Sequence, residues 1–253
     1  MTKRIEILGV PVDVLNMNGA LEEVDLMIQS GVQNTIIAIN PEKVIKAQRD
    51  SALLTWLNRA RLIIPDGIGV VVAARLLKGV VMERVPGSEL MPAICQHSVS
   101  KGYKLFLYGA DPATVEKAVA KLKTTYTGIQ IVGFQDGYIN DNEMPNLIEK
   151  INASDANILF VALGSPRQEL WMDNYLHQLS NIRVCQGVGG TFDVIAGTVK
   201  RAPKFFLNIH CEWLYRLLSQ PKRLLRQTAL PVFAYKVLFD FLMAKHKNLF
   251  KNT

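Results

Sequence analysis

Residues 157–179 read NILFVALGSPRQELWMDNYLHQL and contain a buried strand, a tight turn and a helix in immediate succession. Asn157–Leu163 is a short, almost continuous apolar run, which is typical of a strand that is covered on both faces. Gly164 and Pro166 shape the turn, and Arg167–Leu179 has a helical pattern. A strand that leads directly into a helix is the repeating unit of a parallel sheet. The segment therefore predicts an α/β protein.

The same alternation continues in both directions along the chain. Short β-branched runs predict further strands at Thr35–Ile39, Leu62–Ile64, Lys104–Tyr108, Ile129–Val132 and Arg183–Val188. Helical patterns lie between them, at Asn18–Ser30, Ile68–Leu77 and Glu143–Ile151, and after the pairs Asn40-Pro41 and Asp111-Pro112. Residues 4–15, RIEILGVPVDVL, predict a strand or hairpin with its turn near Gly9. We expect a mainly parallel, Rossmann-like sheet with flanking helices and with ligands at the carboxyl ends of its strands.

Length and composition fit this class. The chain has 253 residues, of which 49% are hydrophobic and 20% charged, so it is neither disordered nor fibrous. The three cysteines, Cys95, Cys185 and Cys211, have neither metal-ligand spacing nor the number of a disulfide framework, which favours a reducing, cytosolic compartment. The beginning of the chain has no signal-peptide pattern, and no apolar run reaches the roughly 18 residues of a membrane span.

Charge is distributed unevenly between the two parts of the chain. Residues 200–253 carry 11 Lys and Arg against two acids, whereas residues 1–199 carry 18 basic and 20 acidic residues. We therefore expect an α/β domain over residues 1–199 and a basic, apolar, helical appendage over residues 200–253, broken at Pro221 and Pro231. Its aromatic and basic residues are not arrayed on strands, which favours an anionic membrane surface over nucleic acid as the partner.

The apolar stretch Leu230–Ala244 is 15 residues long and contains Lys236 and Asp240. It is too short and too charged to cross a bilayer. Two interpretations stay open, a helix that lies in the membrane interface and a helix of the core or of a dimer contact. Both agree with a helical appendage.

Asp66 is the first candidate for chemistry. It follows an apolar strand and stands between Pro65 and Gly67, with no basic residue beside it. A carboxylate at a strand end can act as a general base. The alternative is a turn residue or the N-cap of the next helix.

Two glycine-containing turns are candidates for binding phosphate or another ligand. Gly164–Glu169 joins a strand to a helix start, where backbone N–H groups suit an anion, although ordinary capping by Ser165 is the alternative. Gly187–Thr191 allows a ligand to approach the backbone closely, but it matches no nucleotide-binding motif. Because C-x-x-C, H-E-x-x-H, G-x-S-x-G and Asp-x-Asp are all missing, we expect no metal and no cofactor.

The appendage supplies candidate cations for a diphosphate. Arg216, Arg223 and Arg226 stand among aromatic and leucine residues, and the last two are one helical turn apart. The alternative is a solvated basic face over an apolar stripe.

Five segments in fixed order resemble one family. They are AINPEK (residues 38–43), IPDGIG (64–69), GSPRQE (164–169), GGTFDVIAGTVKRAPK (189–204) and EWLYRLLSQPKR (212–223). Together they resemble the WecG/TagA/CpsF glycosyltransferases, glycosyltransferase family 26, from about residue 5 to 228.

The resemblance implies an activity and roles for individual residues. Such enzymes transfer an N-acetylmannosamine-type sugar from a UDP donor to undecaprenyl-diphosphate-linked GlcNAc, with inversion and without a divalent metal, on the cytoplasmic face of bacterial membranes. Asp66 matches the general base, Asn40, Arg84 and Gln168 match polar residues around it, and the three appendage arginines match those that hold diphosphate. Further substrate contacts are expected from residues that follow the strands, namely Gly109, Asp136, Tyr138, Gly164, Ser165, Gly189, Gly190, Thr191 and Asp193.

The resemblance leaves the donor open. The segments AIN, QDGY, GSPRQE, KRAPK and EWLYRLLSQP look closer to the enterobacterial-common-antigen branch, which uses the uronic acid form of the donor; unoxidised N-acetylmannosamine, as in the teichoic-acid branch, is second. A uronate would need an additional cation, for which Arg84, Arg167 and Lys200 are candidates. A non-catalytic peripheral membrane module is the alternative of another class, and self-association through a surface covered by the appendage is left open.

Overall fold

The computed structural model describes residues 2–199, 203 and 228–251, and a six-stranded parallel sheet is its central feature. The strands are β3 (Asn34–Ile39), β4 (Leu62–Pro65), β5 (Lys104–Gly109), β6 (Gln130–Gln135), β7 (Ile158–Ala162) and β8 (Val184–Gly187). They lie in the order β4-β3-β8-β7-β5-β6, and every neighbouring pair is parallel. The predicted α/β class, the parallel sheet and each predicted strand are confirmed.

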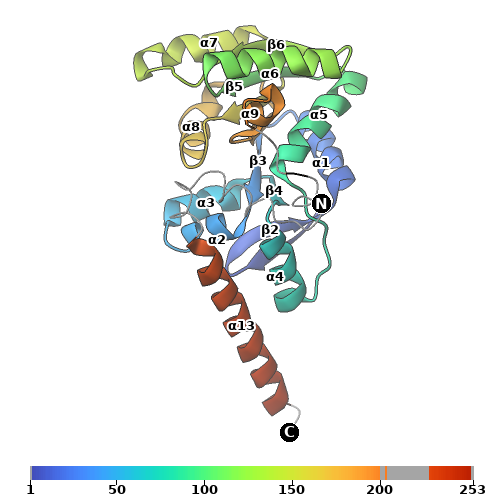
Figure 1. Ribbon diagram of the computed structural model, residues 1–253, viewed down its shortest axis with the longest axis vertical. Coiled ribbons are helices and arrows are strands. Elements are labelled where there is room, and N and C mark those ends of the chain that lie inside the picture. Colours follow the sequence, from blue (N-terminus) through green and yellow to red (C-terminus); the bar gives the residue numbers. More distant parts are fainter. Residues whose placement is uncertain (1, 200–202, 204–227, 252–253) are drawn as a thin grey trace.

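Helices cover both faces of the sheet (Figure 1). One face is covered by α1 (Met17–Gln29), α5 (Gly87–Lys101), α6 (Pro112–Thr125) and α9 (Thr191–Ala196). The other face is covered over β5, β7 and β8 by α7 (Met144–Ala153), α8 (Arg167–Tyr175) and the short 3-10 helices η1 (Asp141–Glu143) and η2 (Leu176–Gln178). Over β3 and β4 it is covered by the hairpin of β1 (Lys3–Ile7) and β2 (Val10–Val14), together with α2 (Pro41–Ala47), α3 (Ser51–Arg59) and α4 (Ile68–Lys78).

The alternation of side chains along each strand explains this layering. On β5, Leu105 and Leu107 are buried against the layer of α1, α5 and α6. Phe106 and Tyr108, one residue out of phase, are buried against α7 and α8. Because successive strand residues point to opposite faces, a strand that is apolar throughout needs a layer of helices on each side.

The N-terminal hairpin protects the edge of the sheet at β4. Asp13, which is buried, accepts a hydrogen bond from the backbone N–H of Ile63 at 2.8 Å, and Arg4 binds both oxygens of the same carboxylate at 2.7 and 2.9 Å. An edge strand has unpaired backbone groups that can recruit other strands. Asp13 therefore satisfies one of them from outside the sheet.

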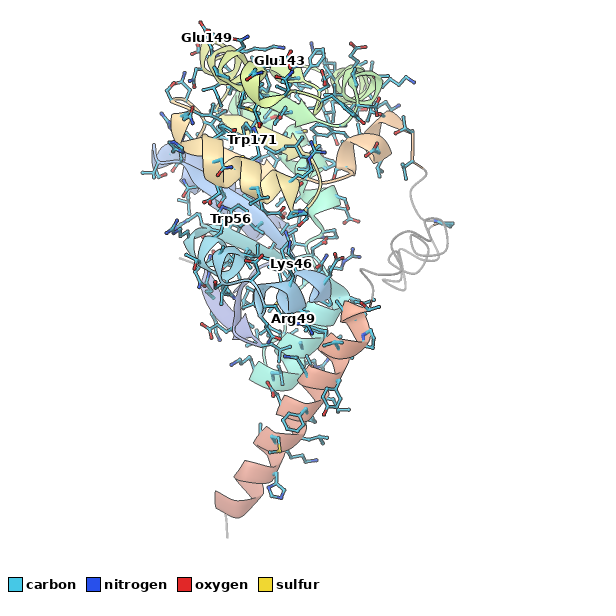
Figure 2. All side chains as sticks on the ribbon, turned by 90° about the vertical axis from the view of Figure 1, so that its left-hand side faces the viewer. Lys46, Arg49, Trp56, Glu143, Glu149 and Trp171 are labelled. Atoms are coloured by element: carbon cyan, nitrogen blue, oxygen red, sulfur yellow. The ribbon has the colours of Figure 1, made fainter. Side chains whose placement is uncertain are left out.

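The C-terminal helix α13 (Ala229–Lys251) is anchored to the body at its beginning and then extends away from it (Figure 1). Phe233 and Val237 are buried in the cluster formed by the hairpin, α2 and α4, and Lys236 Nζ donates to Gln48 Oε1 at 2.7 Å. A cavity of about 430 Å³ lies between α2 and the first residues of α13, on the side where Figure 2 labels Lys46 and Arg49.

The predicted break at Pro231 is wrong, because α13 begins at Ala229 and runs on past it. Proline is tolerated in the first turn of a helix, where its missing N–H would have no partner anyway. Pro221 lies outside the described residues, and the boundary between residues 199 and 200 stays a prediction. Among the described helices, α13 included, none is both long enough and apolar enough to cross a membrane.

Candidate active site

The candidate site lies at the carboxyl ends of four neighbouring strands, β4, β3, β8 and β7. Asp66 follows β4, Asn40 follows β3, and Gly189 follows β8. Gln168 is the second residue of α8, which begins a short turn after β7. Because parallel strands end at the same edge of a sheet, the fold brings together residues that are far apart in the sequence.

Asp66 is held by backbone interactions on two sides. Its N–H donates to the carbonyl oxygen of Ile39 at 3.0 Å, and its side-chain Oδ1 accepts from the backbone N–H of Gly87 at 3.1 Å. Arg84 Nε donates to the carbonyl oxygen of Asp66 at 2.5 Å. The N-cap of α4 is Gly67, with no side-chain cap, so Asp66 does not serve as the N-cap that the alternative proposed.

Asn40 lies directly against the Asp66 turn. It is the N-cap of α2, as predicted, and its Oδ1 accepts from the backbone N–H of Lys43 at 2.9 Å. A Cβ on Gly67 would lie 2.7 Å from Pro41 Cδ and 3.1 Å from Asn40 Cα. The two turns can therefore touch only because residue 67 has no side chain.

Gln168 reaches across the end of β8. Its Oε1 accepts from the backbone N–H of Gly189 at 3.0 Å, and the side chain is buried. A Cβ on Gly187 would lie 2.5 Å from Gln168 Nε2. Glycine at position 187 thus provides the space in which the amide of Gln168 lies.

An ion pair that the sequence did not predict joins the turns after β3 and β7. Lys43 Nζ is 2.8 Å from Glu169 Oε1, and both side chains are largely buried. Burial raises the pKa of Glu169, but the adjacent Lys43 ammonium, together with hydrogen bonds from the Glu169 backbone and Ser165, outweighs this, so the pKa lies below its usual value. The only signal in the sequence was proximity, because Lys43 and Glu169 belong to the same short segments as Asn40 and Gln168.

A second group of predicted residues lies beyond β5, β6 and β7. Gly109 has a φ of +120°, and a Cβ there would lie 2.5 Å from the carbonyl oxygen of Ala162, so the position requires glycine. Asp136 accepts from the backbone N–H of Tyr138 and from Gln135 Nε2, each at 2.9 Å. Since the chain leaves β5 and β7 toward opposite sides of the sheet, a ligand crevice is expected between their carboxyl ends.

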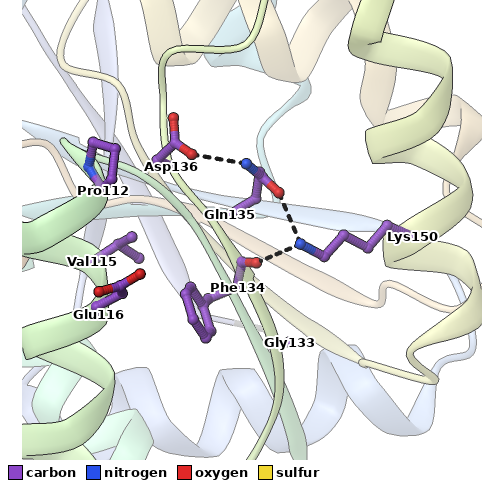
Figure 3. A pocket seen from close by; sticks show the side chains of 8 residues that line it. All are labelled: Pro112, Val115, Glu116, Gly133, Phe134, Gln135, Asp136 and Lys150. Atoms are coloured by element: carbon purple, nitrogen blue, oxygen red, sulfur yellow. Dashed lines mark hydrogen bonds between the residues drawn. The ribbon is translucent and has the colours of Figure 1, made fainter.

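Asp136 is one of the residues that line a cavity of about 370 Å³, and Figure 3 draws these residues. Lys150 lines this cavity, and its Nζ donates to the carbonyl oxygen of Phe134 at 2.9 Å and to Gln135 Oε1 at 2.8 Å (Figure 3). The polar chain from Lys150 through Gln135 to Asp136 fixes the start of the loop that carries Tyr138. The Tyr138 side chain itself is 77% exposed, so it is accessible to a ligand.

Arg167 supplies a cation at the rim between the two groups. It is the exposed first residue of α8, directly before Gln168. The pKa of Tyr108 is raised to about 12, mainly by burial; Asp136 contributes to the rise and Arg167 opposes it. Both charges therefore lie close enough to act on the hydroxyl of Tyr108, at the end of β5.

The remaining predicted positions have mixed outcomes. Gly164 has a φ of +74°, and Ser165 does not cap α8, because the N-cap is Pro166 without a side-chain hydrogen bond. Thr191 is buried and its hydroxyl donates to the carbonyl oxygen of Val188 at 2.6 Å, which indicates a structural role. Gly190 precedes α9, and a Cβ on it would lie 3.4 Å from Asp193 Oδ2, so these two residues are adjacent.

Other predicted features lie outside this group or outside the described residues. Arg216, Arg223, Arg226, Lys200 and Cys211 are in segments that the structure does not describe. Cys95 and Cys185 are buried and form no disulfide with each other, and burial raises the pKa of both thiols. Within residues 2–199, 203 and 228–251, no three His, Cys, Asp or Glu side chains are grouped so that they could hold a metal ion.

A carboxylate, two amides and cations at the carboxyl edge of a doubly covered parallel sheet lie where α/β proteins bind their ligands and substrates. Residues 5–247 match the model of the glycosyl transferase WecG/TagA/CpsF family. The chain belongs to this family of glycosyltransferases.

Two relatives are named N-acetylglucosaminyldiphosphoundecaprenol N-acetyl-beta-D-mannosaminyltransferase. The one from Bacillus spizizenii is 37% identical over 203 residues, which are 80% of this chain and 78% of the relative. The one from Bacillus subtilis is 35% identical over 211 residues, 83% of this chain and 81% of the relative. The resemblance inferred from the five segments is therefore confirmed, and the protein is a glycosyltransferase rather than a non-catalytic membrane module.

Proposed function

We propose that this enzyme transfers an N-acetylmannosamine-type sugar from a UDP donor to GlcNAc-diphosphoundecaprenol, with inversion and with Asp66 as the general base. The arrangement around Asp66 carries the proposal. Its carboxylate is fixed by Gly87, its turn lies against Asn40, and Arg84 is bonded to its backbone. The names of the relatives supply the acceptor and the sugar class.

The chemistry requires one base and one set of cations. Asp66 takes the proton of an acceptor hydroxyl, whose oxygen forms a bond to the anomeric carbon while the bond from that carbon to the diphosphate oxygen breaks. UDP departs from the opposite face, so the configuration inverts. Cations stabilise the negative charge that develops on the diphosphate. We assign this role to Arg216, Arg223 and Arg226, with Arg167 at the rim as a further cation.

Two donors differ only at C6. The segments of the enterobacterial-common-antigen type favour N-acetylmannosaminuronic acid, and the exposed guanidinium of Arg167 beside Gln168 would suit its carboxylate. The names of the two relatives favour unoxidised N-acetylmannosamine. We propose the uronate as the first donor and the unoxidised sugar as the second. Arg167→Gln should raise the KM of the uronate donor more than that of the other.

We also propose peripheral attachment to the cytoplasmic face of the bacterial membrane. The acceptor named for the relatives is a lipid, so its sugar head is presented at a bilayer surface. Helix α13 has exposed apolar side chains, including Leu238, Phe239 and Leu242, and residues 200–253 are strongly basic. Apolar residues that enter the interface together with cations suit an anionic leaflet.

UDP release tests the proposal directly. The assay combines a synthetic GlcNAc-diphospho-lipid with UDP-N-acetylmannosaminuronic acid or UDP-N-acetylmannosamine, each with and without EDTA. We expect acceptor-dependent UDP release from one donor, undiminished by EDTA, and a product of inverted anomeric configuration. Absence of release from both donors with folded protein would overturn the proposed reaction, and loss of release with EDTA would overturn metal independence.

A further inference from the structure

We infer that Lys43 and Glu169 form a positioning pair, which holds Asn40 and Gln168 in register with Asp66 and leaves substrate binding to other residues. The inference rests on the proposed glycosyl transfer and adds to it two residues whose side chains have no role in the sequence analysis.

The pair is the central link of a continuous chain of contacts across the site. Asn40 Oδ1 accepts from the backbone N–H of Lys43 at 2.9 Å, and Lys43 Nζ reaches Glu169 Oε1 at 2.8 Å. Glu169 follows Gln168 directly, and Gln168 Oε1 accepts from the backbone N–H of Gly189 at 3.0 Å. The chain therefore ties the turns after β3, β7 and β8 to one another, although Lys43 and Glu169 are 126 residues apart in the sequence.

Stability alone does not explain a pair in this place. The side chains of Lys43 and Glu169 are only 12% and 6% exposed, so both charges lose most of their hydration on folding. Replacing such a pair by apolar residues of similar volume is often neutral or stabilising. In the Arg61–Glu23 pair, by contrast, the arginine is 34% exposed and retains much of its water. We therefore explain the buried pair by positioning, because it joins the segments that carry Asn40 and Gln168.

The contacts of Lys43 also favour a positioning role for this residue over a role in substrate binding. The ammonium of Lys43 is engaged by a buried carboxylate, which neutralises it locally. A lysine that bound the diphosphate would mainly affect donor affinity. A lysine that acts through Asn40 and Gln168 should instead affect the catalytic step, because a displacement of about 1 Å can reduce a rate about 100-fold.

The test replaces both partners at once. Single substitutions would leave an unpaired buried charge and disturb folding, whereas K43M/E169L fills the space with apolar groups. The control is R61M/E23L, which removes an ion pair distant from the turns of the site. Both double variants and the wild type are compared for thermal unfolding, kcat and the KM of the UDP-sugar.

We expect K43M/E169L to unfold within a few degrees of the wild type and to lose about 10- to 100-fold in kcat. Its donor KM should stay within about threefold, since uniform binding is unaffected. R61M/E23L should keep the kcat of the wild type. Lys43→Arg, which retains the charge pair, should keep at least about a third of it.

Two results would overturn the inference. If K43M/E169L keeps most of the wild-type kcat, the pair does not position any residue on which the catalytic step depends. If the donor KM rises while kcat is unchanged, Lys43 binds substrate and is not a positioning residue. Failure of the wild type itself to release UDP would instead count against the proposed function, so the two failures are distinguishable.

Discussion

The carboxylate of Asp66 and the backbone N–H of Gly87 are 3.1 Å apart, which joins the end of strand β4 to the first residue of helix α5. The N-terminus of a helix carries unpaired N–H groups and a partial positive charge, so it stabilises an anion there. The Asp66 carboxylate thus receives its orientation from a residue 21 positions further along the chain, at the start of α5. Close packing maintains this contact, because a Cβ on Gly87 would lie 3.3 Å from the Cβ of Ala38.

Asp66→Asn should abolish most of the turnover while leaving the fold intact. The amide has nearly the same shape as the carboxylate and can still accept from Gly87, but it cannot take a proton from the acceptor. We expect kcat to fall by about 100- to 10,000-fold, the range for loss of a general base, with an unchanged unfolding temperature. UDP release and thermal unfolding measure the two quantities.

Asp50→Asn is the matched control, since Asp50 is the N-cap of α3 and accepts from the backbone N–H of Leu53. Asparagine caps a helix about as well as aspartate. Activity and stability should therefore match those of the wild type. Equal turnover by the Asp66→Asn enzyme would exclude Asp66 as the base.

Gly187→Ala should impair catalysis through Gln168. The new methyl group would lie 2.5 Å from Gln168 Nε2, and the least costly relief is a movement of that flexible side chain. The hydrogen bond from Gly189 to Gln168 would then break. We expect a loss of about tenfold or more in kcat with a small change in stability. A wild-type kcat would show that the position of the Gln168 amide is unimportant.

Gly19→Ala controls for the added methyl group. Gly19 lies in the first turns of α1, and a Cβ there meets its neighbours only at 3.5 Å, an ordinary contact. Alanine should stabilise the helix by about 0.5–1 kcal/mol and leave kcat unchanged. Steady-state kinetics and urea unfolding of both variants provide the comparison.

Asp13→Asn should destabilise the protein without affecting the chemistry. The buried carboxylate accepts from Arg4 and from the backbone N–H of Ile63, and an amide cannot satisfy all these donors. We expect a loss of about 2 kcal/mol in the free energy of unfolding. Asp155→Asn, which affects an exposed carboxylate 3.5 Å from Lys104 Nζ, should cost less than about 0.5 kcal/mol. Equal urea midpoints for the two variants would contradict this account of the sheet edge.

The hydrogen-bonded pair of Asp25 and Tyr103 should make the free energy of unfolding depend on pH, through Asp25 at acid pH and through Tyr103 at alkaline pH. Burial raises the pKa of Asp25, but hydrogen bonds from Lys101, Tyr103 and His97 outweigh this, so the pKa lies below its usual value. The stabilisation is therefore complete above the unfolded pKa of about 4 and is lost as the pH falls through the lower folded value. Burial and Asp25 raise the pKa of Tyr103 to about 12, so stability also declines between about pH 10 and 12 as the unfolded phenol ionises.

The free energy of urea unfolding as a function of pH tests this cluster, with the wild type compared to Asp25→Asn. The difference between them should shrink below about pH 4. Tyr103→Phe should remove the decline in the free energy of unfolding at alkaline pH, which is assigned to the phenol. The decline at acid pH, which is assigned to the Asp25 carboxylate, should remain. Parallel curves for wild type and Asp25→Asn below pH 4 would contradict the assignment.

Sequence reasoning found the strands and turns of the site because local signals mark them. Asn40 before Pro41 predicted a capped helix, and Asp66 between Pro65 and Gly67 predicted a strand-end turn; both interpretations of local structure are confirmed. These signals depend on residues within a few positions of one another.

The parts that were not predicted depend on packing between distant segments. Helix α5 is not among the helices that the sequence predicts: Pro92 lies inside it, and it forms because tertiary packing buries its apolar face. The contact of Gly87 with Asp66 follows from that helix and was therefore missed. No local pattern could reveal the Lys43–Glu169 pair, since it exists only once β3 and β7 are separated by the single strand β8.

The last prediction concerns the apolar stripe of α13, which comprises Tyr235, Leu238, Phe239 and Leu242. These exposed residues recur at the i, i+3, i+4, i+7 spacing, on the side of the helix away from buried Phe233 and Val237. Deleting residues 200–253 would test membrane attachment poorly, because it would also remove Phe233 and Val237 from the core. Substitutions confined to the stripe leave Phe233 and Val237 packed in the core.

L238Q/F239S/L242Q should therefore reduce binding to vesicles of phosphatidylglycerol and phosphatidylcholine, while turnover of a short-chain, water-soluble acceptor stays unchanged. Three apolar side chains that no longer enter the interface, at about 1 kcal/mol each for partial burial, predict a roughly 100-fold loss in partitioning. L26Q/V32Q removes exposed apolar groups near α1 and should bind like the wild type. Undiminished vesicle binding by the α13 variant would exclude this stripe as the membrane contact, and a change from dimer to monomer in sedimentation would assign it to self-association instead.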